Sequence, residues 1–98
     1  MSLVPALWPL ATRIDRHGRL AIGSTDLVAL AERWGTPLYV YDAATVRGAY
    51  RAYRAAFRGA GSVRVSYAMK ACGLVGVAGL LAAAGADASA ASLGEVLA

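Results

Sequence analysis

Lys70 is the residue whose type and position could do covalent chemistry in this chain. It is the only lysine among 98 residues, and it directly follows residues 63–69, where apolar and polar side chains alternate as in a strand. A lysine at the end of a buried strand can have its ammonium group desolvated, and desolvation favours the neutral amine that attacks an aldehyde. Lysines also often follow strands and only extend into water, so a solvated Lys70 is the alternative.

The other reactive side chains give weaker indications of a functional site. Cys72 is the only cysteine, and we interpret it as a small core residue because no general base is in view. One histidine and scattered acidic residues predict no metal site.

The sequence before residue 42 predicts mostly local structure. Residues 1–23 should be irregular, with a turn at His17-Gly18 and a possible short strand at 19–22. Ser24, Thr25 and Asp26 are residue types that favour the start of a helix, and Gly35 predicts where that helix ends. Residues 38–41 are rich in β-formers and predict a strand.

From residue 42 on, helix and strand signals alternate. Asp42 can cap a helix that ends near Gly59, with Tyr50, Tyr53 and Phe57 expected in the core. After the strand at 63–69, residues 74–84 are apolar on all sides, which predicts a largely buried helix closed by Gly85. A weak strand should occupy 87–91, and the Ser92-x-x-Glu95 capping box predicts the start of a further helix.

This alternation predicts an α/β fold with a parallel sheet. Two parallel strands cannot form a stable sheet alone, because both faces and both edges need cover. We therefore expect the chain to be part of a longer protein.

Charge and composition argue against some classes of partner. The net charge of +4 comes almost wholly from nine scattered arginines, without the basic cluster typical of nucleic-acid binders. One predicted helix carries a row of four arginines, Arg47, Arg51, Arg54 and Arg58. We interpret this row as a solvated helix face, with a surface for phosphate or an acidic partner as the alternative. The sixteen uncharged residues at 71–86 are short for a bilayer span, so we expect protein interior rather than membrane. A single cysteine and the absence of a signal peptide predict a cytoplasmic protein.

Three motifs resemble one enzyme family. Residues 67–70, Tyr-Ala-Met-Lys, resemble the cofactor-lysine motif of the fold-type III decarboxylases, the alanine-racemase-like barrel enzymes that act on diaminopimelate, ornithine or arginine. Residues 35–42 resemble the family's stretch before its first helix, and residues 92–95 resemble its Ser-x-Gly-Glu segment at the matching distance. Trp8-Pro9 and residues 18–20 resemble the diaminopimelate branch in particular.

The resemblance implies a fold and a cofactor. Residues 42–98 would be the first βα units of a pyridoxal-phosphate-binding (β/α)8 barrel, and residues 1–41 would contribute to a β-domain. Lys70 would form the internal aldimine with pyridoxal 5'-phosphate, which acts as the electron sink when carbon dioxide leaves. The full-length enzyme would be a homodimer, and the family's phosphate loop and catalytic cysteine would lie beyond residue 98.

The resemblance also implies cofactor contacts beside Lys70. Ala68 belongs to the same motif, and Ser89 stands where the family usually has an acidic residue near the cofactor. Asp87 lies two residues earlier, and because residues two apart on a strand share a face, it could take the place of that acid.

The implied activity is decarboxylation of an amino acid, with meso-diaminopimelate to lysine plus carbon dioxide expected first. The alternatives are another decarboxylase of this fold, of the ornithine or arginine type, or an amino-acid racemase. A protein that binds pyridoxal phosphate without catalysis, or a helical interaction module, is the alternative of a different class.

Overall fold

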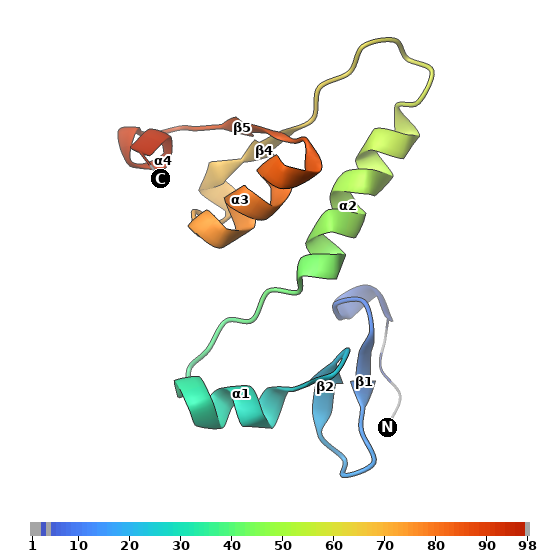
Figure 1. Cartoon of the computed structure of the whole chain (residues 1–98), viewed down its shortest axis with the longest axis vertical. Helices are drawn as coiled ribbons and strands as arrows, with labels where there is room; N and C mark the ends of the chain where they lie inside the picture. Colours follow the sequence, from blue (N-terminus) through green and yellow to red (C-terminus); the bar gives the residue numbers. More distant parts are fainter. Residues whose placement is uncertain (1–2, 4, 98) are drawn as a thin grey trace. The chain divides into compact units, whose positions relative to one another are not determined.

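The computed structural model describes residues 3 and 5–97, and contacts divide the chain into two compact units, Met1–Asp42 and Ala43–Ala98 (Figure 1). Each unit has its own small sheet, so the architecture is mixed α/β. The division falls beside the domain boundary expected after residue 41. The assignment of the first unit to a β-domain stays a prediction.

The first unit is built on a three-stranded antiparallel sheet with the order β1-β2-β3. A short 3-10 helix, η1 (Pro5–Leu7), precedes the strands β1 (Thr12–Ile14), β2 (Leu20–Ile22) and β3 (Thr25–Asp26). Arg13 pairs with Ala21, which is the buried residue of this sheet at 2% exposure. The expectation that residues 1–23 are irregular is therefore wrong for β1. A three-residue strand is too short to display the alternation that identifies a strand in sequence.

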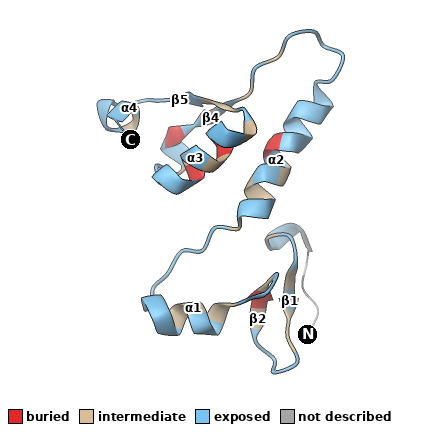
Figure 2. Ribbon diagram, viewed as in Figure 1, coloured by how far each residue is buried: buried red, intermediate tan, exposed pale blue. Residues whose placement is uncertain are grey.

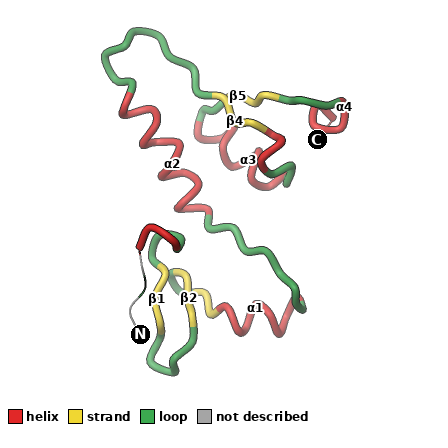
Figure 3. The backbone as a smooth tube through the Cα atoms, turned by 180° about the vertical axis from the view of Figure 1, so that it is seen from behind, coloured by secondary structure: helices red, strands yellow, loops and turns green. Residues whose placement is uncertain are grey.

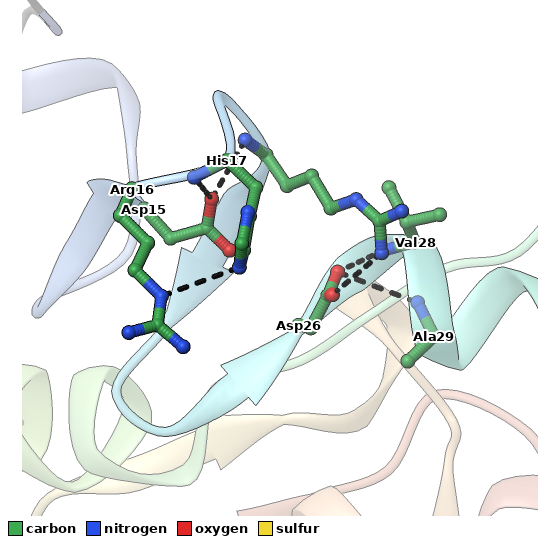
Figure 4. A network of polar contacts seen from close by, with 7 residues as sticks. Asp15, Arg16, His17, Asp26, Val28 and Ala29 are labelled. Carbon is green, nitrogen blue, oxygen red and sulfur yellow. Dashed lines mark hydrogen bonds and ion pairs between the residues drawn. The ribbon is translucent and has the colours of Figure 1, made fainter.

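The turn between β1 and β2 is held by the carboxylate of Asp15. This side chain accepts hydrogen bonds from the backbone N–H groups of His17 at 2.8 Å and Arg19 at 3.0 Å (Figure 4). The bond from Arg19 is the main cause that lowers the pKa of Asp15. The turn predicted at His17-Gly18 is confirmed, and Gly18 adopts the positive φ of +77° that such a turn requires.

Helix α1 (Leu27–Trp34) has the two ends that the sequence predicts. Asp26 is the N-cap, and its carboxylate accepts from the N–H groups of Val28 at 2.8 Å and Ala29 at 3.4 Å (Figure 4). Burial alone raises the pKa of Asp26, but these bonds and the ion pair with Arg19 outweigh it, so the pKa is lowered. Gly35 ends the helix with a positive φ of +80°.

The strand expected at residues 38–41 does not form. The segment is in no strand, and Tyr39 is 88% exposed. β-forming residues favour a strand only where a neighbouring strand and a covering layer exist. In the described part of the chain, no strand forms a ladder with this segment, so its composition alone does not produce one.

The second unit has the predicted order of helix, strand, helix, strand and helix. Its elements are α2 (Ala43–Ala56), β4 (Ser66–Ala68), the 3-10 turn η2 (Met69–Ala71), α3 (Val75–Ala84), β5 (Asp87–Ser89) and α4 (Leu93–Leu97). Strands β4 and β5 pair in parallel, as the alternation predicts, and α3 forms the crossover between them (Figure 1). A long loop joins α2 to β4 (Figure 3).

The core of this unit is small. Tyr50 of α2 packs with Val77 and Leu81 of α3, and Tyr67 of β4 lies partly buried against them. Tyr53 is 63% exposed and Phe57 is 51% exposed, so the expectation that both are core residues is wrong for this structure. The amphipathic face of α2 is longer than the surface that α3 and the two strands offer it.

Helix α3 is exposed over most of its surface, although it is apolar on all sides (Figure 2). Val77 and Leu81 are its buried residues, whereas Leu74 just before it and Val75 are more than half exposed. The expected extensive burial is thus wrong for this structure, because a two-stranded sheet and one helix cover a single side. Among the described residues, no helix has both the length and the apolar character to cross a membrane.

Gly85 ends α3 as the sequence predicts. Its φ of +107° is in the left-handed region, and its N–H donates to the carbonyl of Ala82 while Ala86 N–H donates to that of Leu81 at 3.0 Å. A Cβ atom at Gly85 would lie 3.2 Å from the hydroxyl oxygen of Tyr50. Both the backbone conformation and the contact with Tyr50 therefore favour glycine.

We expect Gly85→Ala to lower the free energy of unfolding by about 1–2 kcal/mol, the cost of a left-handed conformation for an L-residue. The matched control is Gly79→Ala in the middle of α3, where a Cβ meets no atom within 4 Å and φ is not in the left-handed region. That substitution should leave stability equal or raise it by up to about 1 kcal/mol. Urea unfolding of the full-length variants measures both, and equal effects of the two would contradict the structure.

Candidate functional site

The register of the parallel strands brings two of the predicted site residues together. Ala68, the last residue of β4, pairs with Ser89, the last residue of β5. Both side chains are exposed, and because Tyr67 packs into the core, Ala68 and Ser89 lie on the opposite face of the sheet. The carboxyl ends of parallel strands are where α/β proteins bind ligands.

Lys70 lies at the same end, two residues beyond Ala68, in the 3-10 turn η2. The preceding residue, Met69, is 4% exposed and anchors the turn, whereas the Lys70 side chain is exposed. The structure thus places Lys70 just beyond the carboxyl ends of the strands, where Ala68 and Ser89 end the two strands. Burial of the Lys70 amine is not provided by the described residues and stays a prediction for the full-length protein.

Tyr67 and Cys72 close the segment that carries Lys70. The Tyr67 hydroxyl donates a 2.7 Å hydrogen bond to the backbone carbonyl of Cys72, directly after the turn. Burial is the main cause that raises the pKa of the Tyr67 phenol above 10.0, so the hydroxyl is protonated and able to donate at neutral pH. In the sequence, the only signal for this bond is the inward position of Tyr67 in the strand alternation.

The structure places Asp87 away from Lys70. Asp87 is the first residue of β5 and pairs with Ser66, at the amino ends of the strands. Its carboxylate accepts a 2.7 Å hydrogen bond from Nε of Arg64 within an ion pair, and this bond is the main cause that raises the pKa of Arg64. Asp87 therefore lies at the opposite end of the strand pair from Ala68 and Ser89, although it shares a sheet face with Ser89. Its predicted cofactor contact stays a prediction.

The residues after β5 form the predicted capping box. The N–H of Glu95 donates to the Ser92 hydroxyl at 3.2 Å, and the Glu95 carboxylate accepts from the Ser92 hydroxyl at 2.9 Å and from the N–H of Ala91 at 3.3 Å. This reciprocal bonding starts α4 where the sequence predicts. Both side chains are thereby used as a helix cap.

The fold and the site together define a parallel strand–helix–strand unit with a lysine just beyond its first strand. Three curated proteins similar to the chain are each named diaminopimelate decarboxylase. The protein of Synechocystis sp. (strain ATCC 27184 / PCC 6803 / Kazusa) is 38% identical over 92% of the chain. That of Methanothermobacter thermautotrophicus is 40% identical over 85% of it, and that of Bacillus subtilis (strain 168) is 48% identical over 61%.

These similarities support the decarboxylase family for the chain. The chain spans 14 to 20% of the length of the three relatives. No family model matches the chain, and no solved structure matches it significantly.

The partly buried environment of Tyr67 predicts a measurable titration. Because its pKa is raised, the folded protein holds the phenolic proton more tightly than the unfolded chain does. The stability from the protonated phenol is therefore present below pH 10.0 and lost as the pH rises through the folded value above it. The difference in absorbance at about 295 nm between the wild type and Tyr67→Phe should show ionisation above pH 10.0. Ionisation at or below that pH would contradict the assigned environment.

Proposed function

We propose that the chain is the N-terminal part of a pyridoxal-phosphate-dependent amino-acid decarboxylase, a diaminopimelate decarboxylase that converts meso-diaminopimelate to lysine and carbon dioxide. The observation that carries the proposal is the position of Lys70 directly beyond a parallel strand, in a chain similar over 92% of its length to a protein of that name.

The residues present fit one end of the cofactor. An aldehyde needs a primary amine, and Lys70 offers one; Ala68 and Ser89 are small enough to leave space beside it. When bound, pyridoxal phosphate supplies a sink for the electron pair that remains after carbon dioxide departs. Lys70 would hold the cofactor covalently, and Ala68 and Ser89 would line its site. Groups for the cofactor's phosphate would come from the rest of the protein.

The proposed fold is an alanine-racemase-like (β/α)8 barrel. In it, β4, α3 and β5 would form the first strand–helix–strand unit, and the sheet face of Ala68 and Ser89 would be turned to the barrel interior. Residues 1–41 would belong to a β-domain, and the full-length protein would be a cytoplasmic homodimer. The mostly exposed surface of α3 supports this proposal, since further barrel elements would cover apolar residues such as Leu74 and Val75.

The role of Lys70 is tested in the full-length protein. Reduction with borohydride should fix the cofactor on the peptide that contains residue 70 in the wild type. Lys70→Ala should lose this label, and kcat should fall by at least about a hundredfold, the lower end of what one positioned catalytic group contributes. Lys70→Arg is the matched control, since it keeps the positive charge but offers no amine for the aldehyde. It should also lose the label, whereas a retained label on another residue would refute the proposal.

The substrate is tested with carboxyl-labelled amino acids. Release of labelled carbon dioxide from meso-diaminopimelate, and not from ornithine or arginine, is the expected result. Preference for ornithine or arginine would place the protein in another branch of the fold. Racemisation of the amino acid without release of carbon dioxide would indicate a racemase. A bound cofactor with no turnover of any amino acid would indicate a binding protein.

The ion pair of Asp87 and Arg64 allows the two roles of Asp87 to be separated. If the carboxylate serves only to hold Arg64, Asp87→Asn and Arg64→Ala should lower stability alike and leave the cofactor affinity within about twofold of the wild type. We expect this result from the position of Asp87 at the amino end of β5. A loss of cofactor affinity in Asp87→Asn alone, measured by equilibrium dialysis, would instead make Asp87 the cofactor's acidic neighbour.

A further inference from the structure

We propose that Tyr67 is a positioning residue for Lys70, acting through its hydrogen bond to the backbone carbonyl of Cys72. This inference rests on the proposed function, because it gives a role to the segment that carries the cofactor lysine. Neither the sequence motifs nor the relatives assign a role to the Tyr67 hydroxyl.

The geometry closes a short loop around the lysine. Tyr67 lies in β4, Lys70 lies in the middle of η2, and the carbonyl of Cys72 follows the turn; the hydroxyl of Tyr67 joins the two ends at 2.7 Å. Lys70 is thus the exposed centre of a six-residue segment whose first and last residues are tied together. The bond restrains the backbone from which the lysine side chain extends.

The core holds both residues that the hydrogen bond joins. The ring of Tyr67 packs against the cluster of Tyr50, Val77 and Leu81, and Cys72 is partly buried against the same cluster. Met69 adds a second attachment, since its side chain is buried. The turn is therefore held at both of its ends and by one side chain within it, while Lys70 alone of its residues carries a reactive group.

A fixed backbone matters because the lysine side chain has several rotatable bonds. Its amine must reach the same carbonyl carbon each time the cofactor is attached or regained, and small errors in position slow such steps strongly. Cys72 also ends η2 in an extended conformation, with φ of −160° and ψ of 111°, where helical hydrogen bonding no longer holds the chain. The hydroxyl of Tyr67 supplies a tie at that point.

The test removes one oxygen atom. Tyr67→Phe keeps the ring in the core and deletes the bond to Cys72. The matched control is Tyr50→Phe, which deletes a hydroxyl from the same cluster, where it accepts a 3.3 Å hydrogen bond from Arg54 of the same helix. Both variants are made in the full-length protein. Their unfolding is compared first, so that a general loss of stability is recognised.

Two measurements report on the turn. In the cofactor-free protein, amide hydrogen exchange of residues 69–72 should be about fivefold faster in Tyr67→Phe, the factor expected from one lost hydrogen bond. When the cofactor is added back, its attachment to Lys70 should be about tenfold slower. In the loaded enzyme, kcat should fall by a similar factor while KM changes less than twofold. Tyr50→Phe should match the wild type in all three.

The proposal is overturned if the rates of amide exchange at residues 69–72 and of cofactor attachment in Tyr67→Phe are within twofold of the wild-type rates. It is also overturned if Tyr50→Phe changes these rates as much as Tyr67→Phe does. If Tyr67→Phe yields no folded protein, Ala71→Gly loosens the same turn without touching the core, and wild-type attachment in it would equally overturn the proposal. A cofactor that stays bound in Lys70→Ala would refute the proposed function. If Lys70→Ala loses the cofactor but Tyr67→Phe behaves like the wild type in exchange and attachment, only the role of Tyr67 is refuted.

Discussion

The parallel pairing of β4 with β5 is the interaction on which the rest of the second unit depends. Its register sets Ala68 beside Ser89 and leaves the 3-10 turn with Lys70 just beyond them. The same register places Asp87 beside Ser66, at the far end of the pair. A shift by one residue would turn Tyr67 out of the core and move every one of these side chains to the other face.

The two faces of this strand pair have separate tasks. On one face, Tyr67 joins α2 and α3 in the small core and ties the lysine turn through the carbonyl of Cys72. On the other face lie the exposed side chains of Ala68 and Ser89, at the carboxyl ends of the strands. This separation lets the core fix the position of the turn without filling the space in which a ligand would bind. The proposed chemistry requires both conditions at once.

Sequence reasoning succeeded where structure is decided by local hydrogen bonds. The cap at Asp26, the helix ends at Gly35 and Gly85, and the box formed by Ser92 and Glu95 are all confirmed, since each needs only residues a few positions apart. The parallel pairing was also predicted, because a helical crossover between two strands allows little else.

The failures have the opposite cause. The strand expected at residues 38–41 and the burial expected for α3 depend on distant partners, and composition cannot supply them. At the site, sequence motifs selected Lys70, Ala68, Ser89 and Asp87. The first three lie at or just beyond the carboxyl ends of the strands and Asp87 lies at their amino ends, and their role in one site stays a prediction. The tie between Tyr67 and Cys72 was missed, because a bond from a side chain to a backbone carbonyl leaves no signature in residue types.

The short span of the strand pair has a consequence for the order of folding. Ser66 pairs with Asp87, a separation of only 21 positions, and α3 occupies about half of the interval. Closing such a segment costs little chain entropy, and low contact order favours rapid formation. The segment that carries the lysine can thus form early in folding, but its two strands become a stable sheet only when other structure covers their faces and edges.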